Sequence, residues 1–262
     1  MKRTEIERID TPLPKEIEKL CANAKVYDSS CSAEARVYFI DKDDGYFLKI
    51  SAKDTLRTEA EMTEYFSGRG FCNGVLSYLS EEKDFLITKR VLGEDATHER
   101  FLSNPKKLCD SLAEYLRELH EVDFSDSPVK NRNESYAALV KKNYESGYFD
   151  LSLTEEIYKF ESAREAYDIF ENGKSEFKSD VLLHGDYCLP NVILNEDFSL
   201  SGFIDLGNGG VGDRHIDLFW GTWTLLFNLK TDEYRSRFLD AYGRDKANEE
   251  MLRVIAAAEA FG

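Results

Sequence analysis

The sequence predicts an α+β fold with a small β-rich amino-terminal lobe and a larger, mainly helical carboxy-terminal lobe. Residues 35–40 (ARVYFI) and 46–50 (YFLKI) are rich in β-branched and aromatic side chains and flank DKDDG, which predicts a β-hairpin. Beyond residue 104, most segments carry apolar residues at helical spacing instead. We therefore expect one lobe over residues 1–92 and another over residues 93–262.

A helix and two further strands complete the prediction for the first lobe. Residues 55–66 (TLRTEAEMTEYF) place apolar side chains where they can share one helical face. A glycine-containing stretch follows and ends this helix, and the segments VLSYL and DFLITK after it are typical of strands.

The second lobe begins with a strong helix signal. Asn104 and Pro105 are favoured at the start of a helix, and the leucines at positions 108, 112, 116 and 119 form one stripe. We expect further helices around residues 134–146 and near residues 153–171, and three more between His215 and Phe261. The short apolar segments VLLH, VIL and LSGFI interrupt the helices as strands.

The composition indicates a folded protein of the cytoplasm. Of the 262 residues, 42% are hydrophobic, which is ample for a packed core, and no apolar run approaches the roughly 18 residues of a membrane span. The amino end, MKRTEIERID, lacks the apolar stretch of a signal peptide. Five scattered cysteines without a C-x-x-C pair argue against a disulfide framework or a zinc site and favour a reducing, cytoplasmic location.

The charge balance excludes some partners. With 50 acidic and 34 basic residues, the formal net charge is −16. Such a field repels nucleic acid and anionic lipid and attracts cations. We expect no nucleic-acid partner and no membrane partner; a cationic substrate would fit the charge, although solubility alone also explains it.

One set of polar residues is spaced as phosphoryl transfer requires. The chain has HGD at 184–186, then Asn191, then DLG at 205–207, which matches the protein-kinase spacing of H-R-D-x-x-x-x-N and D-F-G. Phosphoryl transfer needs cations over the phosphates, oxygen ligands for magnesium and a group that orients the attacking hydroxyl. Lys49, on the second strand of the hairpin, and Glu59, ten residues later, supply a possible Lys–Glu pair.

On these motifs the chain resembles the aminoglycoside phosphotransferases, most closely the 3′-phosphotransferases. The likeness spans nearly the whole length, from YFLKI through HGDYCLPN and GFIDLG to the terminal EAFG. It implies a two-lobed protein-kinase-like fold and an enzyme that uses Mg²⁺ and ATP or GTP. The implied reaction moves the γ-phosphate to a hydroxyl of an aminoglycoside, the 3′-hydroxyl in the closest relatives, and so confers antibiotic resistance.

The resemblance also implies roles for the residues of the motifs. Asp186 would orient or deprotonate the acceptor hydroxyl, and Asn191 and Asp205 would bind magnesium. Taken singly, Asp186 is better explained as a turn residue and Asn191 as a helix cap, but all three residues at the required spacing favour the functional interpretation. We expect His184 to be a structural hydrogen-bonder, and Asp217 to brace the catalytic loop by accepting backbone hydrogen bonds.

The nucleotide would bind to the first lobe. The resemblance implies that Lys49 holds the phosphates, that Glu59 positions Lys49, and that Phe47 lies against the adenine. Glu61 and Glu64 lie on the same predicted helix as alternatives to Glu59. No G-x-G-x-x-G precedes the lysine; the equivalent stretch is SSCSAEAR, in which Ser32 is the candidate for a phosphate contact.

The acceptor would be small and cationic. Only a dozen residues separate Asp205 from Asp217, which leaves no room for a peptide-docking region. The segment 150–176 is rich in acidic residues, and in the resembling family such an insert and the chain end grip the amines of the drug. Our acceptor candidates are Glu155, Glu156, Glu259 and Phe261, and a solvated helix face is the alternative for each glutamate.

Two features depart from the family pattern. Gly262 follows Phe261, whereas the closest family members end at the phenylalanine. The helix after Asp217 contains Trp220, Trp223 and Phe227 in WGTWTLLFNL, which is more apolar than expected there. These aromatic residues are either core or a sign of a different acceptor.

Two other functions stay open. A kinase of another small alcohol, such as an amino alcohol or a sugar, would use the same catalytic residues. A nucleotide-binding pseudokinase is disfavoured, because every group needed for magnesium binding and transfer is present.

Overall fold

The structure is a computed structural model that describes residues 3–31 and 35–262. It divides into two compact units. The first comprises the described residues of Met1–Asp95 together with Val192–Gly207, and the second comprises Ala96–Asn191 and Asn208–Gly262. The first unit is mainly strand and the second mainly helix, so the predicted α+β class is confirmed. The predicted boundary after residue 92 stays a prediction.

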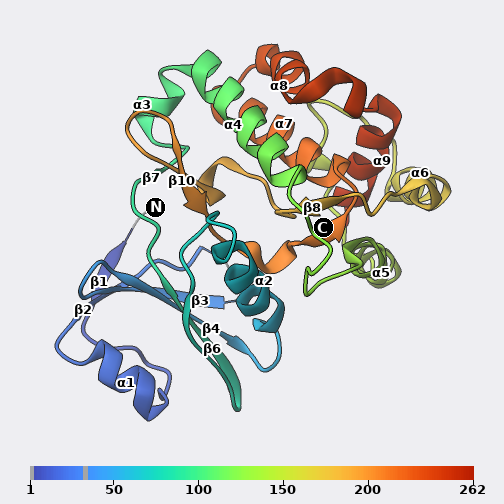
Figure 1. The fold of residues 1–262 in the computed structure, drawn as a ribbon. Helices are drawn as coiled ribbons and strands as arrows, with labels where there is room; N and C mark the ends of the chain where they lie inside the picture. The colour runs from blue at the N-terminus through green and yellow to red at the C-terminus, as the bar shows by residue number, and fades with distance from the viewer. Residues whose placement is uncertain (1–2, 32–34) are drawn as a thin grey trace. The chain divides into compact units, whose positions relative to one another are not determined.

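The first unit is built on an antiparallel sheet (Figure 1). The predicted hairpin of residues 35–40 and 46–50 lies at its centre, and its turn is made by Asp43 and Gly45, both with positive φ. The strands lie in the order β1 (Thr4–Ile6), β2 (Lys25–Asp28), β3 (Ala35–Asp41), β4 (Tyr46–Ala52), β6 (Lys83–Lys89) and β5 (Val75–Ser80).

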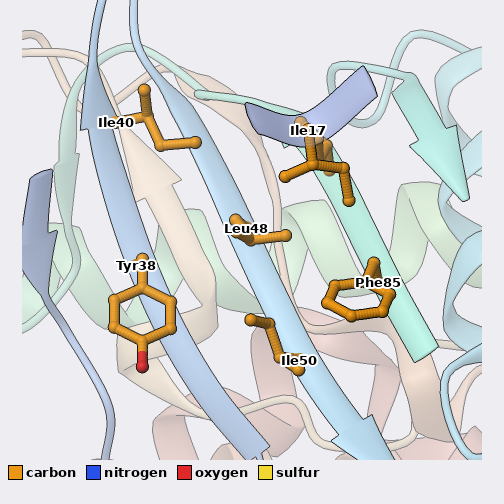
Figure 2. Close-up of a cluster of buried hydrophobic side chains, with 7 residues drawn as sticks. Ile17, Tyr38, Ile40, Leu48, Ile50 and Phe85 are labelled. Carbon is orange, nitrogen blue, oxygen red and sulfur yellow. The ribbon is translucent and has the colours of Figure 1, made fainter. Parts of the chain in front are cut away.

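A helix covers each face of this sheet. On one face, Ile17 of α1 (Lys15–Cys21) packs against Leu48 of β4, and Figure 2 shows these side chains among Ile40, Ile50 and Phe85. On the other face, α2 (Arg57–Ser67) packs its apolar residues against β5 and β6. Because side chains alternate along a strand, the residues on either side of Leu48 point toward α2.

A hairpin from later in the chain also belongs to the first unit. β9 (Val192–Leu194) pairs with β10 (Leu200–Phe203) on one side and with β7 (Glu94–Asp95) on the other. Phe203 anchors it: its amide donates to the carbonyl of Phe71 at 2.6 Å, and the two rings stack with centroids 5.8 Å apart. The segment that follows Phe203 is therefore fixed within this unit.

The second unit consists mainly of helices around a short two-stranded sheet of β8 (Val181–Leu183) and β11 (Gly210–Gly212). Figure 1 shows α4, α7 and α8 side by side, and they pack against one another. The leucine stripe of α4 is fully buried, as its spacing predicted. The helices are α3 (Glu99–Leu102), α4 (Pro105–His120), α5 (Arg132–Ser146), α6 (Ala163–Gly173), α7 (His215–Leu229), α8 (Glu233–Gly243) and α9 (Glu249–Glu259).

The helix predicted near residues 153–171 begins later than expected. Residues 151–153 form one turn of 3₁₀ helix, turns follow, and α6 starts only at Ala163. The reason is a capping box: Ser162 Oγ accepts from the amide of Glu165 at 3.1 Å, and a Glu165 carboxylate oxygen accepts from the amide of Glu161 at 2.6 Å. Within the described ranges, no helix has both the length and the apolar character that crossing a bilayer requires.

Candidate active site

The first unit holds an ion cluster of Lys49, Glu59 and Asp205. Lys49 Nζ lies 2.7 Å and 2.9 Å from the two carboxylate oxygens of Glu59 and also bonds to Asp205 Oδ1. The lysine is on the face of β4 that α2 covers, so the residue that meets it is Glu59 and not Glu61 or Glu64. The predicted Lys–Glu pair is thus present, and its role toward a nucleotide stays a prediction.

The electrostatics of this cluster keep the lysine charged. Burial by itself lowers the pKa of Lys49, but the carboxylates of Glu59 and Asp205 outweigh it and raise that pKa above its ordinary value. Burial raises the pKa of Glu59, and the positive charge of Lys49 opposes this effect. Lys49 therefore carries a positive charge within this cluster.

Asp205, two residues after the end of β10, is held in an unusual backbone conformation. Its φ is +64°, in the left-handed region that few residues other than glycine adopt. Its side chain is 49% exposed, so the carboxylate is accessible although one oxygen meets Lys49. Backbone strain of this kind persists where the surrounding structure enforces it and is common at functional sites.

In the second unit, the loop after β8 carries Asp186. Gly185 has φ +85°, and a Cβ at this position would lie 1.9 Å from the carbonyl oxygen of Asn208. Only glycine fits there. Asp217 accepts hydrogen bonds from the amides of His184 and Gly185, both at 2.8 Å, so its predicted role as a brace is confirmed.

A buried histidine that the sequence analysis missed holds Asp217 in turn. His120 Nε2 lies 3.1 Å from Asp217 Oδ2, and His120 Nδ1 lies 2.8 Å from the hydroxyl of Tyr242. Burial lowers the pKa of His120 and so favours the neutral ring. Nε2 then donates to the carboxylate and Nδ1 accepts from the tyrosine. The sequence does carry an indication of this buried histidine: His120 lies four residues after Leu116, at the position where the apolar stripe of α4 ends in a polar side chain.

The side chains of Asp186 and Asn191 lie together in this loop. Asn191 Nδ2 donates to the carbonyl of Asp186 at 3.0 Å and to its Oδ2 at 2.8 Å. The amide of Asp186 donates to His184 Nδ1 at 3.3 Å, which is the structural hydrogen bond expected of that histidine. Burial, with the charge of Asp186, raises the pKa of the neighbouring Cys188 thiol well above its ordinary value, so the thiol stays protonated.

Glu259 is a buried carboxyl group in the same unit. Only 5% of it is exposed, and the hydroxyl of Tyr136 donates to its Oε1 at 2.8 Å. Burial raises the pKa of Glu259 to about 7 and the charge of Asp186 adds to the effect, whereas Tyr136, Trp220 and Arg132 oppose it. Asp186 and Glu259 both belong to the second unit, where the charge of Asp186 contributes to the raised pKa of Glu259.

The other acceptor candidates differ in exposure. Glu155 and Glu156 lie in an exposed turn after the 3₁₀ helix. The ring of Phe261 is fully buried in edge-to-face contacts with Tyr144 and Tyr167, with centroids 5.6 Å and 6.1 Å away. That ring anchors the chain end, and its contact with an acceptor stays a prediction.

Two predicted nucleotide contacts remain untested. Phe47 lies two residues before Lys49 on β4, and its ring is 5.3 Å from that of Phe39, with the guanidinium of Arg3 5.4 Å from its centroid. Ser32 lies outside the described residues.

The donor atoms suit magnesium. Asn191 uses its NH₂ toward Asp186, which leaves its carbonyl oxygen as an oxygen donor, and Asp205 has a half-exposed carboxylate; their role as magnesium ligands stays a prediction. Magnesium takes oxygen ligands and keeps several waters, so one or two protein ligands are enough. Among the described residues, no group of three or more His, Cys, Asp and Glu is arranged to hold a metal.

Comparison with known proteins identifies the family. The model of the phosphotransferase enzyme family matches residues 30–254 of the chain. This chain belongs to the phosphotransferase enzyme family. Within that family it is 50% identical, over 250 residues and 95% of each chain, to a probable aminoglycoside 3′-phosphotransferase of Lactococcus lactis subsp. lactis (strain IL1403).

Two further relatives support the family assignment and the fold. An aminoglycoside 3′-phosphotransferase of Niallia circulans is 31% identical over 220 residues, which cover 82% of this chain and 83% of the relative. The crystal structure of an aminoglycoside-3′-phosphotransferase of type VIII is 25% identical with a TM-score of 0.68, over 90% of this chain and 91% of that one. The predicted resemblance, the protein-kinase-like fold and the phosphotransferase activity are confirmed.

Proposed function

We propose that this phosphotransferase moves the γ-phosphate of a nucleoside triphosphate to the 3′-hydroxyl of an aminoglycoside and thereby confers resistance. The observation that carries the proposal is the Asp186–Asn191 pair, joined at 2.8 Å on a loop that Asp217 braces through two backbone amides. The relative that is 50% identical is named a probable aminoglycoside 3′-phosphotransferase, which supports the choice of acceptor and hydroxyl.

In this mechanism Asp186 positions the acceptor hydroxyl. Asn191 binds Oδ2 of its carboxylate, and the remaining lone pairs of the carboxylate can accept the hydroxyl proton. Phosphoryl transfer passes through a loose transition state, so orientation matters more than the strength of the base. A carboxylate held by a buried amide on a braced loop provides that orientation.

Lys49 holds the phosphates of the nucleotide, and Glu59 holds Lys49. Asn191 and Asp205 would ligate magnesium, which supplies positive charge to the phosphate oxygens when it is bound. The chain connects these two residues through the β9–β10 hairpin: Val192, directly after Asn191, pairs with Phe203, two residues before Asp205. The co-substrate in this mechanism is a nucleoside triphosphate, either ATP or GTP.

The acceptor is recognised by negative charge. Glu259, buried beside the catalytic loop, binds an ammonium group of the aminoglycoside, and Glu155 and Glu156 bind others from their exposed turn. The net charge of −16 steers a polycation toward the protein. Because all five cysteines are free, as a reducing compartment requires, we place the reaction in the cytoplasm.

A panel of acceptors tests the function. Release of ADP is measured with kanamycin- and neomycin-type aminoglycosides, neutral sugars and amino alcohols, and the product is mapped by NMR to the phosphorylated hydroxyl. We expect turnover with the aminoglycosides at the 3′-hydroxyl. Turnover with a neutral sugar or an amino alcohol alone would establish the alternative small-alcohol kinase, and no turnover with any acceptor would favour a pseudokinase.

The metal is tested in the same assay. Activity should vanish with EDTA and return with magnesium, because the proposed ligands are oxygen atoms. Activity that resists the chelator, or that returns with zinc alone, would contradict the assignment of Asn191 and Asp205.

A further inference from the structure

A chain of hydrogen bonds leads from Asp217 away from the catalytic loop, within the second unit. Its first member is His120, whose Nδ1 lies 2.8 Å from the hydroxyl of Tyr242 on α8. Arg214, the residue before α7, donates from Nη1 to the same hydroxyl at 3.3 Å and from Nη2 to Asp180 Oδ2 at 2.9 Å. We call the series Arg214, Tyr242 and His120 the donor relay.

The outer end of the donor relay fixes the direction of each bond in it. A guanidinium has N–H donors and no acceptor, so Arg214 can only donate to the hydroxyl oxygen of Tyr242. Among the described residues, the remaining partner of this buried hydroxyl is His120 Nδ1, which therefore accepts the hydroxyl proton. The proton of the neutral ring is then on Nε2, which donates to Asp217 Oδ2 at 3.1 Å.

The tautomer of His120 matters because Asp217 braces the catalytic loop as an acceptor. Its two carboxylate oxygens accept from the amides of His184 and Gly185, next to Asp186. Asp217 is 0% exposed, so no water replaces a missing donor. The other tautomer of the ring would turn a lone pair toward this carboxylate and would weaken its hold.

The donor relay and the brace hold β8 at both of its ends. Asp180, which pairs with Arg214, directly precedes this strand. His184, which donates to Asp217, directly follows it. Because Arg214 and Asp217 both lie at the start of α7, the position of the catalytic loop on this helix depends on both contacts.

The inner part of the donor relay is closed to solvent. Tyr242 is 1% exposed and the side chain of His120 is 2% exposed, whereas the side chain of Arg214 is 19% exposed. Burial raises the pKa of Tyr242 to about 12, although Arg214 opposes this effect, so the hydroxyl keeps the proton that it donates. A buried acceptor that loses its donor bears the full cost of desolvation, so a missing donor should be felt at Asp217.

We infer that Arg214 and Tyr242 are positioning residues for phosphoryl transfer, because they fix the tautomer of His120. Through His120 they keep Asp217 in place as the brace of the loop that carries Asp186. This inference goes beyond the proposed function: it concerns the phosphotransferase reaction itself and holds for any acceptor.

Removal of one hydroxyl tests the middle of the donor relay. Tyr242→Phe should lower kcat about three- to thirtyfold in the ADP-release assay, as for a brace that loses one buried hydrogen bond, with the KM for ATP and for the acceptor within about twofold of wild type. Tyr234→Phe is the matched control, because Tyr234 is a buried tyrosine of the same helix outside the donor relay. It should keep wild-type kcat.

The outer end is tested by charge and by shape. Arg214→Met removes the outermost donor and should lower kcat, whereas Arg214→Lys keeps a donor and should recover part of the loss. Arg237→Met is the matched control: Arg237 of α8 also pairs with an aspartate, Asp110, at 2.6 Å, but it lies outside the donor relay. Loss of kcat in the Arg237 variant equal to that in Arg214→Met would overturn the role of Arg214.

Nitrogen-15 NMR of the histidine rings gives a readout that needs no acceptor. The chain has four histidines, so their ring signals can be told apart. In wild type, His120 should carry its proton on Nε2 and have an unprotonated, hydrogen-bonded Nδ1. In Tyr242→Phe, the Nδ1 signal should move toward that of a ring nitrogen without a hydrogen bond, whereas Tyr234→Phe should leave it in place.

The outcomes separate this inference from the proposed function. A Tyr242→Phe variant that is less stable in urea but has wild-type kcat would show that the tyrosine is structural only and would overturn the inference. A proton on His120 Nδ1 in wild type would overturn it as well. If another alcohol is phosphorylated and aminoglycosides are not, the proposed function fails, and the same kcat comparison with that alcohol decides the donor relay.

Discussion

Ionisation of Glu259 should make the stability of the protein depend on pH in a way that one substitution removes. Burial raises the pKa of this carboxyl group from 4.5 to about 7. Because the folded state binds the proton more tightly than the unfolded state, the stabilisation is fully present below about pH 4.5 and is lost as the pH rises through 7. The shift of about 2.5 units corresponds to about 3 kcal/mol of unfolding free energy.

Glu259→Gln is the perturbation that isolates this effect. The amide oxygen of Gln keeps an acceptor for the hydroxyl of Tyr136, which lies 2.8 Å from Oε1, but it cannot ionise. All other titrating groups are shared, so the difference between wild type and variant reports on Glu259 alone. The free energy of unfolding of wild type, relative to the variant, should fall by up to about 3 kcal/mol from pH 5 to pH 8.

The assay is urea unfolding followed by circular dichroism at half-unit steps of pH, together with acceptor KM at each pH. In wild type, the KM for kanamycin A should fall relative to that of the variant as Glu259 ionises and gains charge for the ammonium. Parallel stability curves for the two proteins between pH 5 and pH 8 would refute the argument that burial holds this carboxyl group protonated.

Three further predictions follow from the same geometry. Gly185→Ala should lower the free energy of unfolding by several kcal/mol and abolish turnover, because the added Cβ would lie 1.9 Å from the carbonyl oxygen of Asn208. Gly147 has a similar φ of +75° with open space around it, so Gly147→Ala should lower the free energy of unfolding by only about 1–2 kcal/mol. Equal losses for the two variants in urea unfolding would contradict the steric account. Asp217→Asn places an NH₂ group against backbone amide donors and should lower kcat more than tenfold in the ADP-release assay; wild-type kcat would show that the brace is dispensable. Acceptor KM should rise steeply between 0.1 M and 1 M salt, as the Debye length falls from about 10 Å to about 3 Å, while the nucleotide KM responds differently; a flat acceptor KM would exclude steering by charge.

Local patterns in the sequence were enough for the elements with strong signals. The β3–β4 hairpin has a turn that needs positive φ, and α4 has an apolar stripe with a proline at its first position, so both were predicted close to their observed bounds. Among the elements that were not predicted, β1, α1 and β2 are short, and their patterns of apolar residues are too brief to stand out. They exist because β2 pairs with β3, β1 pairs with β2 and Ile17 packs into the core of the sheet, and these contacts are not local in sequence.

Some residues of the candidate site could likewise be predicted from a local sequence pattern, and others could not. The spacing of Asp186, Asn191 and Asp205 is a linear pattern and could be recognised directly. The surroundings of Glu259 could not, because Tyr136 on α5 is 123 residues away in sequence and no periodicity links the two. The capping-box pattern that begins at Ser162 is visible in the sequence and marks the start of α6. Without it, the predicted helix begins about ten residues too early.

The most direct test of the account is the turnover of Asp186→Asn with kanamycin A and ATP-Mg²⁺. Asn is nearly isosteric and keeps an oxygen for the hydrogen bond from Asn191, but it is a poor acceptor for the hydroxyl proton. We predict that kcat falls by about 10²- to 10⁴-fold while nucleotide affinity, measured by calorimetry, stays within a fewfold of wild type. A variant that phosphorylates kanamycin A at near wild-type kcat would contradict the assignment of Asp186 as the residue that positions the acceptor hydroxyl.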